Sequence, residues 1–336
     1  MIAVVKAKKG VEIKEVPYPQ MNPDEVIIQV KYAGICGSDI NRYLDNIFLP
    51  PGITLGHEFS GVIVEKGDNV RNLEVGDRVT ASVAKTCGLC FYCQTGLSPL
   101  CDETKRLGLD YNGAFASYVA VPAKLVHILP EGMSFQVGAS VEPVAVVCRA
   151  IRQVGINGGD TVLVYGPGAI GQYAMQVALA SGAGKAIVVG TRDSRLELAK
   201  KLGAAHTINV KKENLREKVA EYTDGLMADV VVEASGAPDI VDDVFATVRK
   251  GGGVVFAGLP HERSNFDLQA MVRREARIFT SILNDWCDFN QALKLLDYGK
   301  VSTEGIITHE FPLEKFEDAV KAVLERKAVK ALLKVS

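Results

Sequence analysis

The sequence predicts an α/β protein in which a mostly β domain accompanies a second domain built on a doubly wound parallel sheet. The chain has 336 residues, which exceeds the size at which a single hydrophobic core is usual, so two domains are expected. Up to about residue 140, short β-branched runs are broken by Gly, Pro and Asp, as in β domains. After residue 143, continuous apolar runs alternate with helix-length segments, which indicates a parallel sheet covered on both faces.

In the first part, four segments are predicted to form strands because each is short, rich in apolar residues and bounded by turn signals. These segments are 24–34, 59–67, 76–83 and 114–129. The first 16 residues alternate apolar and polar side chains, which is typical of an edge strand and lacks the long apolar core of a signal peptide.

In the second part, the apolar strands are expected within 159–165, 185–190, 228–237 and 251–260. The remaining tail contains two amphipathic helix patterns, with an apolar strand candidate between them. We expect this tail to return to the first domain. The expected domains are therefore 1–143 with 283–336, and 144–282.

Charge and composition limit the classes of partner. The formal net charge is −2, and the Lys and Arg residues are dispersed among as many acids, so no nucleic-acid partner is expected. No run of about 18 apolar residues could span a bilayer, so we expect a soluble, cytoplasmic protein without a membrane partner. Four of the seven cysteines lie within 87–101, which favours metal binding over disulfides.

The sequence GPGAIG at residues 166–171 follows a predicted strand and opens a predicted helix, as in a Rossmann dinucleotide site. Gly166 permits the tight turn, Gly168 lets the backbone approach a pyrophosphate, and Gly171 lets helix and strand pack closely. Ala169 and Ile170 begin the helix, whose positive N-terminus would hold the pyrophosphate. A glycine-rich turn without a ligand is the alternative.

The end of the next strand predicts which dinucleotide binds. An NAD site usually has an acid there for the ribose 2′-hydroxyl, whereas this chain has Gly190, Thr191 and Arg192, with Arg195 close behind. A small residue leaves room for a 2′-phosphate, Thr can donate a hydrogen bond, and Arg matches phosphate geometry. Asp193 lies three residues too late and is interpreted as part of the helix start. NADP is therefore favoured over NAD, although solvated surface arginines are the alternative.

Cysteines at positions 87, 90, 93 and 101 can close one tetrahedral shell, the arrangement of a structural zinc with no open position. The expected zinc lobe covers about residues 85–105. An iron–sulfur cluster would fit four cysteines but not easily this spacing. A zinc module for nucleic acid is disfavoured by the acidic balance of the chain. Structural zinc is the preferred interpretation of Cys87, Cys90, Cys93 and Cys101.

A second candidate set is dispersed along the chain: Cys36, His57, Glu58 and Glu142. One thiolate, one imidazole and one carboxylate would make a three-ligand zinc site with a fourth position open. Each residue also has an ordinary explanation, such as a buried thiol for Cys36 or a helix N-terminal acid for Glu142. Sequence spacing does not bring these residues together.

The chain carries, in order, the motifs GICGSD, GHEFSGVIVEKG, GDRV, the four-cysteine segment, VEPV and GPGAIG. Through these motifs, it resembles the zinc-containing medium-chain dehydrogenase/reductase family essentially from end to end. This resemblance implies a GroES-like β domain completed by the tail, and a catalytic zinc held by Cys36, His57 and a carboxylate. Glutamate at position 142 is similar to the polyol branch, which includes sorbitol, butanediol and galactitol-phosphate dehydrogenases. Glu58 and Glu142 both remain candidates for the third ligand.

The resemblance also implies the chemistry. Zinc would acidify the hydroxyl of a secondary alcohol, Ser38 would accept its proton, and hydride would pass to the nicotinamide. Many relatives carry histidine in the proton relay where this chain has Asn41. A homo-oligomer, dimer or tetramer, is expected by analogy. The alternatives are a threonine dehydrogenase-like enzyme and a non-catalytic dinucleotide-binding protein.

Overall fold

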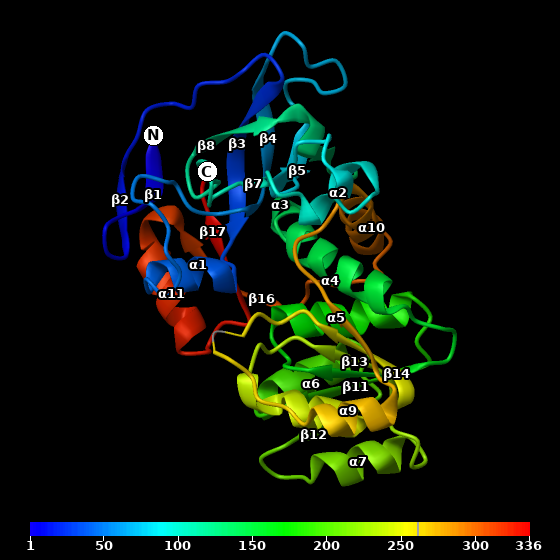
Figure 1. Ribbon diagram of the computed structural model, residues 1–336. Helices are drawn as coiled ribbons and strands as arrows, with labels where there is room; N and C mark the ends of the chain where they lie inside the picture. The colour runs from blue at the N-terminus through cyan, green and yellow to red at the C-terminus, as the bar shows by residue number, and fades with distance from the viewer. Residues whose placement is uncertain (261) are drawn as a thin grey trace. The chain divides into compact units, whose positions relative to one another are not determined.

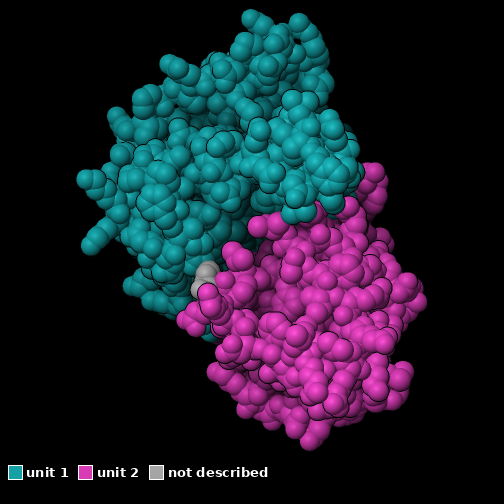
Figure 2. Space-filling model, viewed as in Figure 1, with its two compact units in different colours: residues 1–143, 283–293, 307–336 teal, residues 144–282, 294–306 magenta. Residues whose placement is uncertain are grey.

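The computed structural model describes residues 1–260 and 262–336 of the chain. The chain forms two compact units, coloured separately in Figure 2. Unit 1 comprises residues 1–143, 283–293 and 307–336, and unit 2 comprises residues 144–282 and 294–306. The predicted fold class is confirmed, because one unit is mostly β and the other carries a parallel sheet with helices.

Unit 1 is organised around a seven-stranded sheet with the order β16-β17-β3-β4-β5-β9, in which β8 also pairs with β3. The C-terminal strand β17 runs antiparallel to β3, which joins the tail of the chain to its first part (Figure 1). Two small sheets, β1-β2 and β6-β7, complete the β structure. The strands of this unit are β1 (Ile2–Lys6), β2 (Val11–Glu15), β3 (Glu25–Gly34), β4 (Glu58–Lys66), β5 (Arg78–Ala81), β6 (Ala84–Lys85), β7 (Lys105–Arg106), β8 (Tyr118–Pro122), β9 (Val126–Ile128), β16 (Ile307–Pro312) and β17 (Lys330–Lys334).

The core of unit 1 forms where the apolar side chains of β3 and β4 meet those of a C-terminal helix. Along β3, Val26, Ile28 and Val30 are fully buried. The C-terminal helix α11 contributes Phe316 and Val320 to the same core. The helices of this unit are α1 (Gly37–Tyr43), α2 (Phe91–Gln94), α3 (Phe135–Gly138) and α11 (Phe316–Leu324); short 3-10 turns cover Ser98–Leu100, Ala123–Leu125 and Leu313–Lys315.

Unit 2 contains a six-stranded, fully parallel sheet with the order β12-β11-β10-β13-β14-β15. This order starts in the middle and proceeds outward in both directions, which defines the doubly wound fold. The strands are β10 (Thr161–Tyr165), β11 (Lys185–Gly190), β12 (His206–Asn209), β13 (Ala228–Glu233), β14 (Val248–Phe256) and β15 (Arg277–Thr280). The helices are α5 (Ala169–Ala180), α6 (Asp193–Lys201), α7 (Leu215–Tyr222), α8 (Val241–Thr247) and α9 (Leu268–Arg274), with a 3-10 turn at Pro238–Ile240; α4 (Val141–Val154) and α10 (Trp286–Asp297) each have residues in both units.

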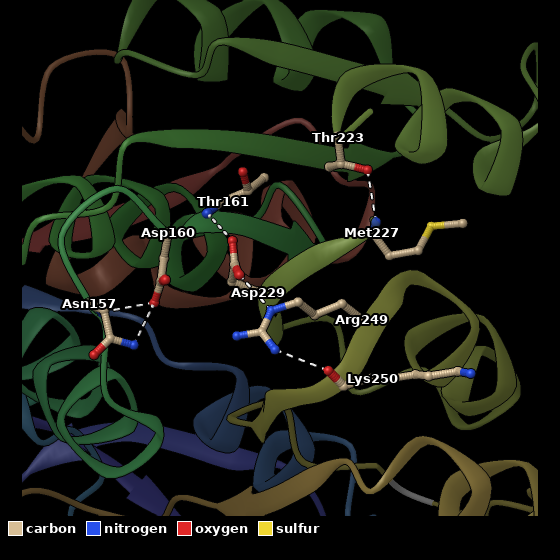
Figure 3. Close-up of polar contacts among 8 residues, drawn as sticks. All are labelled: Asn157, Asp160, Thr161, Thr223, Met227, Asp229, Arg249 and Lys250. Carbon is tan, nitrogen blue, oxygen red and sulfur yellow. Dashed lines mark hydrogen bonds and ion pairs between the residues drawn. The ribbon is translucent and has the colours of Figure 1, made fainter. Parts of the chain in front are cut away.

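Polar contacts hold the amino ends of neighbouring strands in register (Figure 3). The Asp229 carboxylate, on β13, accepts a hydrogen bond from the backbone N–H of Thr161 at 2.8 Å, at the start of β10. It also accepts one from Nε of Arg249 on β14, at 2.6 Å. One side chain therefore joins three adjacent strands. Because the carboxyl ends of these strands carry the ligand in doubly wound folds, their alignment matters for the site.

Two features differ from the sequence expectations. The edge strands β12 and β15 lie outside the four predicted apolar segments, since edge strands need less apolar sequence. Residues 294–306, expected with the first domain, belong to unit 2, where the side chain of Gln176 hydrogen-bonds both backbone groups of Ser302. In the described part of the chain, no helix has the length and apolar character needed to cross a membrane.

Candidate active site and dinucleotide-binding loops

The four cysteines predicted to form one shell lie together in the segment between β6 and β7. The sulfur atoms of Cys87, Cys90, Cys93 and Cys101 all lie within 4.8 Å of one another. The Sγ of Cys87 is 4.0 Å from that of Cys93 and 3.6 Å from that of Cys101. Tetrahedral zinc with bonds of about 2.3 Å separates its sulfur ligands by about 3.8 Å, so the spacing fits a zinc ion. Backbone N–H groups of Leu89 and Cys90 also point at the Cys87 sulfur, which suits a thiolate.

A second group of possible ligand atoms comes from Cys36, His57 and Glu58, whose atoms lie within 4.8 Å of one another. Cys36 immediately precedes α1, and Glu58 is the first residue of β4. The pairing of Gly34 with Glu58 brings the end of β3, and hence Cys36, beside the start of β4. The structure therefore unites three of the four dispersed residues. Thiolate, imidazole and carboxylate form a donor set that suits zinc.

The His57 imidazole is oriented by a buried carboxylate. Its Nδ1 lies 3.5 Å from Oδ1 of Asp39, whose other oxygen accepts a hydrogen bond from the backbone N–H of Cys36 at 3.0 Å. Burial alone would lower the pKa of His57, but the interactions with Asp39 and Cys36 together outweigh burial and raise that pKa well above its usual value. Because the carboxylate of Asp39 faces Nδ1, the other ring nitrogen, Nε2, is left to bind a metal, as is common for histidine ligands.

Glu58 is paired with a cation from the opposite end of the chain. The ammonium of Lys330, on β17, forms an ion pair with Glu58 and donates a hydrogen bond to the backbone carbonyl of Ile35 at 3.0 Å. Only 5% of the Lys330 side chain and 2% of the Glu58 side chain are exposed. Gly34 makes room for the pair, because a Cβ there would lie 2.4 Å from Oε2 of Glu58.

Glu142 occupies the first turn of α4 and lies outside the group formed by Cys36, His57 and Glu58. Its Oε1 accepts a hydrogen bond from Nδ2 of Asn284 at 3.0 Å. The pKa of Glu142 is raised to about 7: burial is the main cause, the charge of His57 lowers the pKa, and the charge of Glu58 raises it. These electrostatic interactions place Glu142 close to the second group.

The helix α1 presents Ser38, which is partly exposed in its first turn. The carbonyl of Ser38 accepts a hydrogen bond from Nη1 of Arg42 at 2.5 Å. Arg42 is buried, so its position at the helix end stabilises α1 rather than meeting solvent. Arg42 therefore supports the turn that carries Ser38.

The glycine-rich loop connects β10 to α5 as predicted. Gly166 has a positive φ of 88°, and a Cβ on Gly171 would lie 2.0 Å from the carbonyl oxygen of Gly166. Gly168 is the N-cap of α5, and Ala169 and Ile170 are its first residues, so the open N–H groups of a twelve-residue helix begin here. This geometry can receive a pyrophosphate.

A second loop packs on this one and was not predicted. Glu233, buried at the carboxyl end of β13, accepts hydrogen bonds from N and Oγ of Ser235 at 2.5 and 2.6 Å, and from N of Gly236 at 3.0 Å. Ser235 in turn packs against the glycine loop, since its Cβ is 2.8 Å from where a Cβ of Gly166 would stand. Glu233 thus holds one loop against the other.

The structure gives a different reason for the glycine at the end of β11. A Cβ on Gly190 would lie 2.5 Å from Cγ of Pro167, so the proline ring fills the space that sequence reasoning left for a phosphate. Thr191 is exposed, and Arg192 is the N-cap residue of α6. The guanidinium of Arg195 lies 3.9 Å from a Cβ built on Gly168, next to the glycine loop.

Comparison with known proteins agrees with this geometry. Residues 22–131 match the family described as alcohol dehydrogenase GroES-like domain, and residues 169–298 match the family described as zinc-binding dehydrogenase. A sorbitol dehydrogenase of Halalkalibacterium halodurans is 38% identical over 340 residues, covering 99% of this chain and 99% of that protein. The chain belongs to the zinc-binding dehydrogenase family. The expected resemblance and the expectation of an enzyme are both confirmed.

Two further relatives of this dehydrogenase are informative. A D-arabitol-phosphate dehydrogenase of Enterococcus avium is 36% identical, over 94% of this chain and 91% of that protein. A Sinorhizobium meliloti 1021 protein described as a zinc-binding dehydrogenase, and solved with bound NADP, matches with a TM-score of 0.94 and 29% identity, covering 99% of both chains.

Sequence reasoning missed four residues that shape the sites of this dehydrogenase: Asp39, Glu233, Asn284 and Lys330. Asp39 could have been recognised from the sequence, because it stands three residues after Cys36. At this spacing, the carboxylate of a residue in the first turn of a helix can accept a hydrogen bond from the backbone N–H of the residue before the helix. Lys330 carried none, because it lies 272 residues from Glu58 in the sequence.

Proposed function

We propose that this dehydrogenase oxidises a secondary alcohol of the polyol, diol or sugar-acid type to the ketone, with zinc and a nicotinamide dinucleotide. The observation that carries this proposal is the group Cys36, His57 and Glu58, faced by a second glutamate, Glu142. A donor set rich in carboxylate is harder than one with two thiolates and suits oxygen-rich substrates. The similarity to sorbitol and D-arabitol-phosphate dehydrogenases supports the same substrate class.

The proposal assigns one catalytic zinc to Cys36, His57 and Glu58, with Glu142 beside them, and one structural zinc to the four-cysteine group. The catalytic zinc, when bound, supplies Lewis-acid stabilisation of negative charge on oxygen. Asp39 holds the His57 ring in place through Nδ1. Lys330 offsets part of the carboxylate charge at Glu58, so the site does not collect uncompensated negative charge.

The proton and the hydride leave the substrate by different routes. Ser38, two residues after Cys36 in the first turn of α1, accepts the hydroxyl proton and passes its own hydroxyl proton to solvent water, since its side chain is partly exposed. A nicotinamide dinucleotide, when bound, would accept the hydride from the carbon that carries the hydroxyl group, which leaves the ketone. Asn41 can hydrogen-bond but not titrate near neutral pH, so the proton does not leave through that side chain.

We assign the dinucleotide to the carboxyl edge of the unit 2 sheet, with the pyrophosphate at Gly166, Gly168 and Gly171, and with Ala169 and Ile170 in the first turn of α5. NADP is the preferred form. Position 190 carries no acid for the ribose 2′-hydroxyl, and the nearby positions 191, 192 and 195 carry Thr, Arg and Arg.

We further propose a homo-oligomer. The strand β15 is an edge of the unit 2 sheet, and Ile278 on it is 44% exposed. Unpaired edge strands with exposed apolar side chains are sites of strand pairing between chains. Other exposed apolar residues of this part of the chain are Leu259, Phe266, Leu268, Val272 and Ile282.

The experiment that tests the proposed function is a panel of polyols, diols, sugar acids and threonine, assayed with NAD and with NADP on protein of measured zinc content. Polyol or diol oxidation with two zinc ions per chain is the expected result. Oxidation of threonine alone would replace the substrate assignment. One zinc per chain would show that one of the two metal assignments is wrong.

A further inference from the structure

The loop that follows β12 lies directly beside the end of β11. The backbone N–H of Val210 donates to the carbonyl of Gly190 at 3.1 Å, and Gly190 pairs with Asn209 in the sheet. The backbone N–H of Lys212 donates to the carbonyl of Asn209 at 2.8 Å, which turns the chain at this point. The side chain of Lys212 therefore starts at the same sheet edge as the loop after Gly190.

Lys212 and Asn209 together hold Asp193, the first residue of α6. The carboxylate accepts one hydrogen bond from Nδ2 of Asn209 at 2.7 Å through Oδ1, and an ion pair with the Lys212 ammonium at 2.6 Å through Oδ2. These two partners, Lys212 first, lower the pKa of Asp193. Both carboxylate oxygens are therefore engaged, and the negative charge is compensated.

An acid at this edge decides which dinucleotide a doubly wound sheet accepts. A free carboxylate near the end of the second strand accepts hydrogen bonds from the adenosine ribose hydroxyls, and it repels a 2′-phosphate. Although Asp193 opens α6 three residues after Gly190, its hydrogen bond from Asn209, the sheet partner of Gly190, keeps its charge at this edge of the sheet. Glycine at position 190 removes the usual acid, but it does not by itself remove the charge of Asp193.

We propose that Lys212 is a specificity-determining residue, which neutralises and holds Asp193 so that this edge of the sheet accepts the 2′-phosphate of NADP. The inference rests on the proposed function, in which this edge binds the adenosine ribose. The ion pair itself adds little to folding stability, since 62% of the Lys212 side chain and 55% of the Asp193 side chain are exposed. Its contribution is to the choice between NADP and NAD.

The experiment measures dissociation constants by calorimetry on the zinc-loaded protein, with NADP, NAD, 2′-AMP and 5′-AMP as ligands. The variants are Lys212→Gln, Asp193→Asn and the double variant, and Lys211→Gln is the matched control on the neighbouring exposed lysine. In Lys212→Gln, the ratio of the NAD to the NADP dissociation constant should fall about tenfold, because the carboxylate of Asp193 then repels the 2′-phosphate without compensation. The control should change the ratio less than about twofold.

The double variant separates this role from a direct phosphate contact. If Lys212 acts by compensating Asp193, Lys212→Gln in the Asp193→Asn background should change the ratio much less than about tenfold. An equal change in both backgrounds would refute the proposal, as would an unchanged ratio in Lys212→Gln. If the wild-type protein binds NAD more tightly than NADP, the NADP assignment fails, but the shift in Lys212→Gln still decides the role of Lys212.

Discussion

Replacing Lys330 with methionine should destabilise the protein strongly, because it removes the cation from a buried ion pair. Methionine keeps most of the length of the lysine side chain but leaves the Glu58 carboxylate without its partner. Both side chains are almost fully buried, and breaking such a pair from one side costs about 3–5 kcal/mol. The carbonyl of Ile35 also loses its donor. We expect the free energy of unfolding of Lys330→Met to fall by about 3 kcal/mol or more.

The assay is urea unfolding of protein freed of metal with a chelator, so that metal binding to Glu58 does not enter the measurement. The control is a double-mutant cycle with Glu58→Gln, because removing both charges together costs less than removing one. The double variant should be more stable than the sum of the two single effects predicts. A loss below about 1 kcal/mol in Lys330→Met, or strict additivity in the cycle, would refute the reasoning.

Three further predictions concern separate parts of the molecule. Cys93→Ser should lower the zinc content from two ions to one per chain and make residues 85–105 sensitive to protease. The control Cys148→Ser should leave the zinc content unchanged. Two zinc ions per chain in Cys93→Ser would exclude the structural site. Burial lowers the pKa of His127 from 6.5 to about 4. The free energy of unfolding should therefore be at its full value above pH 6.5 and fall by about 3 kcal/mol as the pH approaches 4. In urea unfolding, His127→Phe should reduce this pH dependence, and an unchanged pH dependence would contradict the prediction. Light scattering should show a dimer or larger oligomer, and the substitution Ile278→Arg should dissociate it. A monomeric wild-type protein would refute the proposed homo-oligomer.

Local patterns in the sequence predicted the parts of the fold that depend on neighbours in the chain. The central strands β10, β11 and β13 are continuous apolar runs because both of their faces are covered. The glycine loop could be predicted because two of its glycines meet a local backbone requirement: Gly166 has a positive φ, and a Cβ on Gly171 would overlap the carbonyl oxygen of Gly166. The edge strand β15 was not readable, since three of its four residues are exposed and the apolar signal is weak.

The candidate active site could be predicted only in part, for a physical reason. Cys36 and His57 stood out as metal-ligand types, but the atoms that orient and compensate them arrive through the tertiary fold. Lys330 reaches Glu58 because β17 pairs with β3, and Asn284 reaches Glu142 across 142 residues of sequence. The reason for Gly190 was also hidden, because the ring that requires it belongs to Pro167 in another loop.

Two acids at the proposed binding sites are each compensated by a lysine from another strand or loop. The pairs are Glu58 with Lys330 and Asp193 with Lys212. The two pairs differ in burial, and we therefore expect them to have different effects. The first pair is almost fully buried, so removing its cation should cost several kcal/mol of folding free energy. The second is more than half exposed, so its loss should leave the fold intact and change only which ligand the carboxylate repels. The same chemical interaction thus stabilises structure in unit 1 and, by our inference, selects the dinucleotide in unit 2.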